Sequence, residues 1–158
     1  GRLRLAARMI KAGAAARVVY TTQGGYDTHA QQADTHARLL AEFADAVAAF
    51  FIDLKESKLA ERVALLAFSE FGRTIKENQS AGSPGTDHGT AGCVFLAGPG
   101  VKGGVRGTQP SLTDLVLGEP KMTTDFRRVY AAVLADWLSV PLRSLGNSFT
   151  PLELFGTS

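Results

Sequence analysis

The sequence predicts an α/β domain with a mostly parallel sheet. Amphipathic helical patterns alternate with short apolar segments along the chain, and this alternation is typical of strands that are joined by crossover helices. The composition agrees with a globular domain, because 45% of the 158 residues are apolar and 20% are charged. A chain of this length suits one domain with a core of its own.

Composition excludes several classes of protein. Cys93 is the single cysteine, so the chain has no internal disulfide framework. The 17 basic and 15 acidic side chains leave a formal net charge of +2, and no basic cluster indicates a nucleic-acid partner. No apolar stretch approaches the roughly 20 residues that a membrane span needs.

The first half of the chain predicts a helix, a strand and a longer helix. Residues 2–12 form a short amphipathic pattern, and Gly13 is a plausible end for that helix. Residues 16–22 are rich in β-branched and aromatic side chains and predict a buried strand, followed by a polar loop over 23–33. Residues 31–57 predict the strongest helix. Its apolar stripe consists of Leu39, Leu40, Phe43, Val47, Phe50, Phe51 and Leu54.

Two further apolar segments predict strands in the middle of the chain. Residues 63–68 are apolar throughout, as expected of a strand that is covered on both faces. Residues 93–97 form the second segment, in which Cys93 is expected to be a buried core thiol rather than a nucleophile. Between them, residues 69–90 read as a polar loop that is too long for an idle connection in a compact domain.

The last third of the chain predicts one more helix. Residues 100–123 read as a loop, with a short helical turn over 112–117. Residues 124–138 form an amphipathic helix that Thr123 or Thr124 can cap and that Pro141 ends. The tail, residues 142–158, is expected to be irregular and to lie on the surface.

The three histidines carry the strongest indication of chemistry. Each one directly follows an aspartate or lies two residues after one, in the pairs Asp27 with His29, Asp34 with His36, and Asp87 with His88. Imidazole nitrogen and carboxylate oxygen are ligands that suit Zn²⁺ and similar divalent ions. Two of these pairs lie in glycine-rich loops that follow predicted strands, which is where α/β domains usually form their sites.

Each histidine also has a purely structural interpretation. His29 could lie in a turn formed by its aspartate, but we favour the functional interpretation. His36 falls in the first turns of the long helix, and a solvated helix face explains it better. His88 lies between Gly85 and Gly89, which could make only a turn; the functional interpretation is favoured because His29 supplies a second candidate ligand.

A further motif follows the strand at 63–68. In Ser69-Glu70-Phe71-Gly72-Arg73-Thr74, Glu70 could be a ligand or a general base, and Arg73 could bind an oxyanion through its planar fork. Alone the motif is weak, because a turn with two solvated charges explains it equally well. The glycines near Lys102 do not form a Walker motif and are not followed by a helix, so they predict a turn.

Three separated motifs, in this order, resemble the signature blocks of the domain of unknown function 1501 family. They are Gly24-Gly25-Tyr26-Asp27-Thr28-His29, Ser69-Glu70-Phe71-Gly72-Arg73-Thr74 and Gly85-Thr86-Asp87-His88-Gly89, and the helix from Thr124-Asp125-Phe126-Arg127 to Asp136-Trp137-Leu138 extends the match. That family resembles the alkaline phosphatase and sulfatase superfamily. The resemblance implies an α/β/α sandwich with a mostly parallel sheet, of which residues 1–158 form the C-terminal part of a single domain, incomplete by itself.

The resemblance also implies a set of metal ligands. Asp27, His29 and His88 are similar to three ligands of one ion, and Glu70 holds the place of a carboxylate for a second ion. Phe71 stands where a second-metal histidine is expected; either Asp87 compensates or the second metal is absent. The ion would be Zn²⁺, Mn²⁺, Ca²⁺ or Mg²⁺, and Arg73 would bind a non-bridging oxygen of the substrate.

The function implied is metal-dependent hydrolysis of small-molecule or glycan phosphate or sulfate esters. The nucleophile is expected in a segment upstream of this chain, because no strand–loop–nucleophile pattern precedes residue 13. The alternative is a binding or structural module that has lost hydrolysis, which Phe71 favours. The family resemblance further implies a periplasmic or secreted location.

Overall fold

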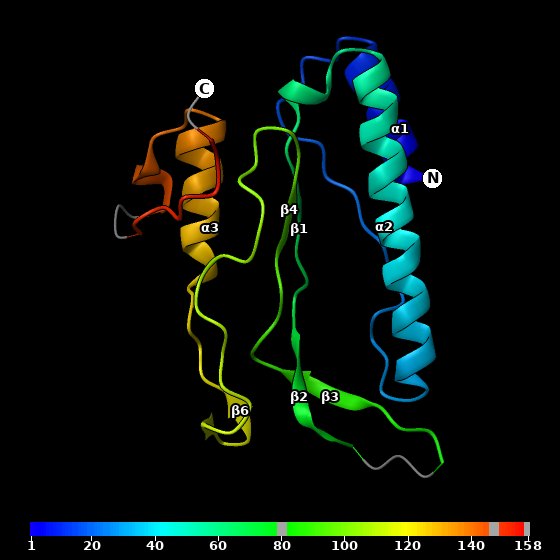
Figure 1. The fold of residues 1–158 in the computed structure, drawn as a ribbon, viewed down its shortest axis with the longest axis vertical. Coiled ribbons are helices and arrows are strands. Elements are labelled where there is room, and N and C mark those ends of the chain that lie inside the picture. Colours follow the sequence, from blue (N-terminus) through cyan, green and yellow to red (C-terminus); the bar gives the residue numbers. More distant parts are fainter. Residues whose placement is uncertain (79–81, 146–148, 157–158) are drawn as a thin grey trace.

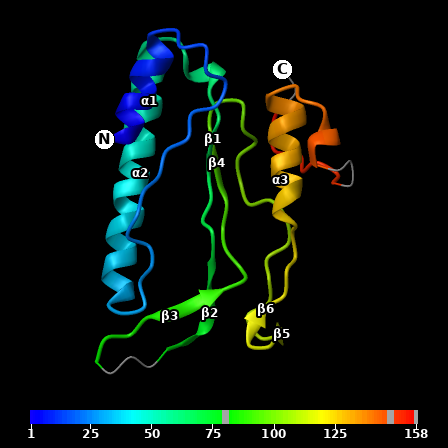
Figure 2. The ribbon, with the colours of Figure 1, turned by 180° about the vertical axis from the view of Figure 1, so that it is seen from behind.

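A computed structural model describes residues 1–78, 82–145 and 149–156 of the chain. The chain forms three layers, in which α1 and α2 lie on one side of a long central ribbon and α3 lies on the other (Figure 1 and Figure 2). The helices are α1 (Arg2–Lys11), α2 (Gln32–Glu56) and α3 (Phe126–Ala132), with single turns η1 (Ala60–Arg62), η2 (Val133–Trp137) and η3 (Leu142–Leu145). The strands are β1 (Leu65–Ala67), β2 (Gly72–Glu77), β3 (Thr86–Gly89), β4 (Phe95–Ala97), β5 (Leu115–Val116) and β6 (Glu119–Pro120).

The sheet corrects the predicted fold class. The strands form antiparallel pairs of two, β1 with β4, β2 with β3, and β5 with β6, so the mostly parallel α/β/α sandwich is wrong. Parallel neighbours need a long crossover, usually a helix. Between β1 and β4 the chain instead makes the β2–β3 hairpin and returns in the opposite direction, with Leu65 opposite Ala97.

The predicted strand at residues 16–22 is also corrected, because this segment is not a strand in the structure. No backbone hydrogen bond joins it to another part of the described chain. Val18 and Tyr20, which were expected to be buried, are 69% and 76% exposed.

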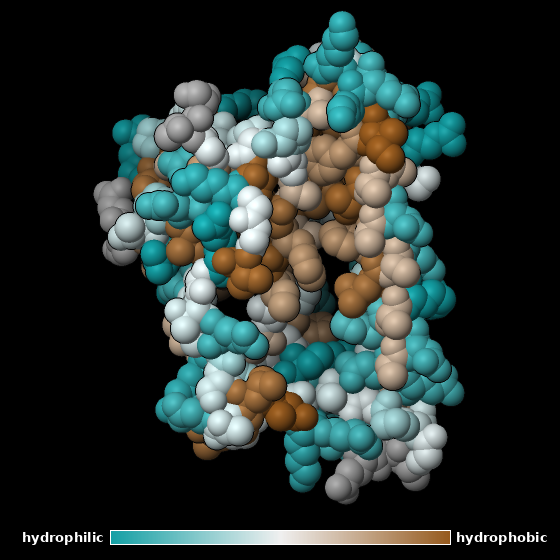
Figure 3. Space-filling view, viewed as in Figure 1, coloured by the Kyte–Doolittle hydropathy of each residue, from teal (hydrophilic) through white to brown (hydrophobic). Residues whose placement is uncertain are grey.

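Figure 3 shows apolar side chains gathered over the middle of one face of the molecule, with polar side chains around the ends of that face.

Two hairpins replace segments that were predicted as loop or helical turn. Residues 69–90 contain β2 and β3, although residues 79–81 of that loop lie outside the described part. Both strands are polar, so they lack the apolar alternation that identifies a strand in a sequence. The predicted helical turn at 112–117 is instead part of the β5–β6 hairpin, in which Leu117 and Gly118 both have positive φ, at 54° and 84°. Positive φ at both central residues is the geometry of a two-residue hairpin turn.

The predicted double coverage of the strand at 63–68 is confirmed by the two cores of the molecule. Alternate side chains of this segment face opposite layers, as the period of two in a strand requires. Val63 and Leu65 pack on the α1–α2 core, whose centre is Leu54, while Ala64 and Leu66 pack on the α3 core.

The helix predictions are confirmed in position but differ at their ends. The first helix ends at Lys11, and Gly13 follows with φ of +72°. The C-terminal helix begins at Phe126, and Asp125, rather than either threonine, caps it by accepting a hydrogen bond from the backbone N–H of Arg127. From Val133 onward that helix continues as a π-helical turn.

Two smaller predictions about burial are corrected. Cys93 is exposed and lies two residues before β4. The tail does not lie wholly on the surface, since Leu154 and Phe155 are buried in the α3 core. Phe155 also forms an isolated antiparallel β-bridge with Val101. Residues 146–148 and 157–158 of the tail lie outside the described part. Among the described residues, no helix combines the length and the apolar character that crossing a membrane requires.

We expect Leu54→Ala to reduce the free energy of unfolding by about 2–5 kcal/mol, because Leu54 is fully buried and its loss leaves a cavity. Leu40→Ala is the matched control on the same helix, since Leu40 is 37% exposed, and should cost less than about 1.5 kcal/mol. Urea unfolding followed by circular dichroism measures both. Equal losses at the two positions would contradict the placement of the core.

The charge on Asp125 should make stability depend on pH. Hydrogen bonds from the Arg127 side chain are the main cause that lowers the pKa of Asp125 from 3.8 to about 2. A lowered pKa stabilises the folded state above 3.8, and this contribution is lost as the pH falls through about 2. Asn keeps the capping oxygen but carries no charge. Asp125→Asn should therefore melt below the wild type at neutral pH, and the gap should close in acid.

The measurement is the melting temperature of both proteins across this pH range. Asp136→Asn is the control, because Asp136 is an exposed carboxylate in the turn that continues α3. A gap that stays constant with pH would contradict the role of the Asp125 charge.

Candidate metal centre

The side chains of Asp27, His29 and His88 converge at one point of the surface. Oδ1 of Asp27 lies 2.9 Å from Nε2 of His29 and 2.8 Å from Nε2 of His88. The two Nε2 atoms are 3.2 Å apart, and the potential ligand atoms of all three residues lie within 4.8 Å of one another. The side chains are 47% to 62% exposed, so solvent and small molecules can reach the cluster.

Two distant parts of the chain supply the cluster. Asp27 and His29 belong to the loop between α1 and α2, whereas His88 lies on β3. Thr28 lies between Asp27 and His29 and is only 6% exposed. Among the described residues, it is the one polar residue that is buried. Its inward position leaves its two neighbours on the outer side, which explains the spacing of one residue between Asp27 and His29.

The loop is held against the hairpin by a close approach of backbone to backbone. A Cβ atom on Gly85 would lie 2.3 Å from the carbonyl oxygen of His29, so a larger residue cannot occupy this position without a shift. The Asn78 amide donates to the same carbonyl oxygen at 2.8 Å, and the N–H of Gln32 donates to the carbonyl of Pro84 at 3.1 Å.

Arg73 joins the loop to both strands of the hairpin. It lies on β2 directly opposite His88. Its two terminal nitrogens donate to the carbonyl oxygens of Thr86 and Tyr26, each at 2.6 Å, and Nη2 lies 3.7 Å from Oδ1 of Asp27. The guanidinium therefore places its positive charge beside Asp27, and its hydrogen bonds hold the backbone of the loop and of β3.

The ring of Phe71 lies flat on the ring of His88. The two centroids are 3.7 Å apart with an interplanar angle of 9°. Arg73 lies over the same phenyl ring, 5.1 Å from its centroid. Phe71 has no ligand atom, but this stack limits the orientations that the His88 ring can adopt.

The electrostatic environment keeps Asp27 ionised. The hydrogen bond with His88 is the largest cause that lowers the pKa of Asp27 below its ordinary value. Charges on His29, His88 and Arg73 lower this pKa further, while the partial loss of hydration opposes them. An ionised carboxylate with two imidazoles is a set of ligands that divalent metals bind.

The remaining predicted metal ligands, Asp87 and Glu70, are not part of the cluster. Asp87 contacts His29 on its other ring nitrogen, Nδ1, at 3.2 Å. Glu70 is exposed and is not part of the ligand group that the described residues form. His36 is exposed, as its structural interpretation predicts, and contacts the Tyr26 ring edge-on with centroids 6.0 Å apart. The roles predicted for Glu70 and Arg73 stay predictions.

Sequence reasoning missed the residues that hold the cluster in place. Asn78 gave no signal, since a single polar residue in a polar loop is unremarkable. Phe71 was noted only as a departure from the metal pattern, although it directly precedes β2, whose Arg73 pairs with His88. The glycines on either side of His88 could have indicated this contact, because Gly85 is where the hairpin packs closely on the loop.

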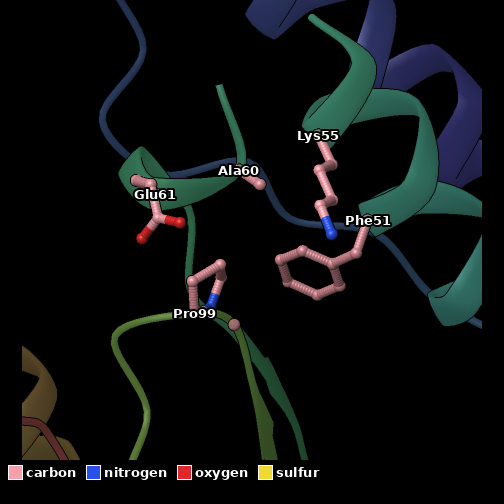
Figure 4. Close-up of a pocket in the computed structure, with 6 residues that line it drawn as sticks. Phe51, Lys55, Ala60, Glu61 and Pro99 are labelled. Atoms are coloured by element: carbon pink, nitrogen blue, oxygen red, sulfur yellow. The ribbon is translucent and has the colours of Figure 1, made fainter. Parts of the chain in front are cut away.

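A cavity elsewhere in the molecule offers a less suitable site. Its volume is about 380 Å³, and the C-terminal part of α2, η1 and the turn after β4 line it, with Phe51, Lys55 and Pro99 around it (Figure 4). Lys55 and Glu61 are its ionisable side chains. It holds neither histidine nor aspartate, so it lacks the ligands that meet at the cluster.

Comparison with known proteins places this arrangement in a family. No curated protein and no solved structure matches the chain. The family model described as "Protein of unknown function (DUF1501)" matches residues 1–137, which include Asp27, His29 and His88. The chain therefore belongs to the DUF1501 family.

Proposed function

We propose that Asp27, His29 and His88 bind one divalent metal ion and that the protein which carries them hydrolyses phosphate or sulfate esters. The observation that carries the proposal is the convergence of one carboxylate oxygen and two imidazole nitrogens from two distant parts of the chain. Exposed acidic groups are common on protein surfaces, but two imidazoles that meet at one carboxylate oxygen are a specific arrangement.

The ligand chemistry favours a particular group of metals. Imidazole nitrogen suits Zn²⁺ and neighbouring transition metals, whereas Ca²⁺ and Mg²⁺ prefer sites made of oxygen. Zn²⁺ or Mn²⁺ is therefore proposed before Ca²⁺ or Mg²⁺. A bound ion of this kind supplies a Lewis acid that polarises an ester oxygen and stabilises a negatively charged nucleophile.

The residues of this chain would prepare the site for an anionic ester. Asp27 contributes negative charge that favours a cation, and Arg73 holds its own positive charge 3.7 Å from Oδ1 of Asp27. Although its terminal nitrogens already donate to two carbonyl oxygens, a guanidinium has five N–H donors. We propose that a remaining donor binds a non-bridging oxygen of the substrate.

The substrate class rests on motif resemblance. The three motifs that identify the family resemble those of the alkaline phosphatase and sulfatase superfamily, whose substrates are phosphate and sulfate esters. We propose small-molecule or glycan esters on this ground, with Glu70 as a further carboxylate near the site and a nucleophile from another segment of the protein.

A second candidate function is binding without hydrolysis. Phe71 favours it, because its ring covers one face of His88 where a second metal ligand was expected. A module of this kind would retain the metal and the anion-binding charge but would not turn over an ester.

We expect the full chain to take up one Zn²⁺ or Mn²⁺ ion, and the double substitution His29→Ala with His88→Ala to abolish this uptake. Two of the three proposed ligands are then absent. Dialysis against each metal followed by elemental analysis gives the stoichiometry. His36→Ala is the control, since it removes an exposed histidine outside the cluster. Unchanged metal content in the double variant would refute the metal assignment.

The ester screen distinguishes hydrolase from binding module. We expect the whole protein to hydrolyse an aryl phosphate or an aryl sulfate only after Zn²⁺ or Mn²⁺ is added. His88→Ala should lower the rate about a hundredfold or more, because metal-ion stabilisation of the transition state is worth several kcal/mol. His36→Ala should keep the wild-type rate. Metal uptake without turnover of either ester would favour the binding module.

A further inference from the structure

We propose that Asp87 is a positioning residue that orients His29 for metal binding, rather than a ligand. This inference rests on the proposed metal centre and adds a function to a residue that the cluster itself does not include. The observation is a contact of 3.2 Å between Oδ1 of Asp87 and Nδ1 of His29.

The His29 ring is held between two carboxylates at its two nitrogens. Nε2 faces Asp27 and His88, at 2.9 Å and 3.2 Å, while Nδ1 faces Asp87. Because Nδ1 and Nε2 lie on opposite sides of the ring, the Asp87 carboxylate meets the ring away from the point where the ligand atoms converge. The Asp87 carboxylate therefore contacts the His29 ring on the side away from the other two ligands.

This contact favours, in the metal-bound state, the tautomer in which His29 can act as a ligand. A neutral imidazole carries one N–H proton, and only its other nitrogen has a lone pair for a metal. A metal ion bound by Asp27 and His88 would take the Nε2 lone pair, and Asp87 would then accept the proton that Nδ1 must carry. Histidines that bind metals commonly donate their second N–H to a carboxylate in this way.

The backbone around this contact keeps the two residues at a constant separation. Asp87 is the second residue of β3, and Gly85 at the entrance to that strand packs directly on the His29 carbonyl. The Asn78 amide donates to the same carbonyl, and Oγ1 of Thr86 donates to Oε1 of Gln32 at 3.0 Å, on the far side of the loop. The carboxylate is therefore placed by the same contacts that bring the loop to the hairpin.

The test compares Zn²⁺ affinity in four forms of the full chain: wild type, Asp87→Ala, Asp87→Asn and Glu77→Ala. We expect Asp87→Ala to weaken binding about tenfold, the lower end of the usual range for such partners, because the Asp87 side chain is 64% exposed. Asp87→Asn keeps an acceptor oxygen and should stay within about threefold of the wild type. Glu77→Ala removes an exposed carboxylate on β2, which lies opposite Thr86, and should leave the affinity unchanged.

The pattern separates orientation from charge. If Asp87→Asn weakens binding as much as Asp87→Ala, or if Glu77→Ala weakens it equally, the effect is charge alone and the proposal is overturned. If Asp87→Ala binds as tightly as the wild type, the proposal is also overturned while the metal centre stands. A wild-type chain that binds no Zn²⁺ overturns the proposed function itself, and the positioning role with it.

A spectroscopic measurement keeps the test independent of small changes in stability. With Co²⁺ bound, the Nδ1–H protons of two histidine ligands give separate, strongly shifted exchangeable resonances. We expect Asp87→Ala to shift one resonance and speed its exchange with water, because only His29 loses its acceptor, and to leave the His88 resonance in place. Two resonances that stay unchanged, or that move together, would contradict a specific action on His29.

Discussion

The close approach of the loop after α1 to the β2–β3 hairpin is the constraint on which the candidate site depends. Gly85 permits it, since any side chain there would collide with the His29 carbonyl. Arg73 secures it by donating to carbonyl oxygens of the loop and of β3. Asp27 and His29 lie 58 or more positions from their contacts Asp87 and His88 in the sequence, so no local preference could bring them together. The site is a consequence of this one contact between two polar segments.

The electrostatics of the cluster follow from the same contact. Oδ1 of Asp27 has two imidazole nitrogens within 2.9 Å and a guanidinium nitrogen at 3.7 Å. These neighbours stabilise the ionised carboxylate, which is why its pKa is lowered although the side chain is well exposed. At neutral pH the two imidazoles also crowd one another, with their Nε2 atoms 3.2 Å apart. A divalent cation would satisfy the lone pairs of all three groups at once, and this is the physical reason for proposing one.

The sequence predicted the positions of the helices but not the sheet. The apolar stripe of α2 follows from a helical period, and the double coverage of residues 63–68 follows from an unbroken apolar run. The pairing of β1 with β4 does not, because periodicity contains no information about strand direction. The β2–β3 hairpin was missed since its polar strands carry no apolar alternation, yet it supplies His88 and Arg73. The Asp–His pairs were candidates from residue type, and the grouping of Asp27, His29 and His88 came from the family resemblance. The clamp by Asn78 and the stack of Phe71 depend on geometry that only the fold provides.

Phe71 connects the number of ligands to the chemistry proposed for the centre. A phenyl ring has no lone pair, so its stack on His88 orients that ligand and shields one face without adding a donor. The described residues then offer three ligand atoms to an ion. Catalytic zinc sites characteristically have three protein ligands and one position for water or substrate, whereas structural sites are closed by four. An exposed group of three is therefore the arrangement that leaves an ester oxygen room to bind. Phe71 adds no ligand atom to this group of three, so the cluster suits a centre for one ion.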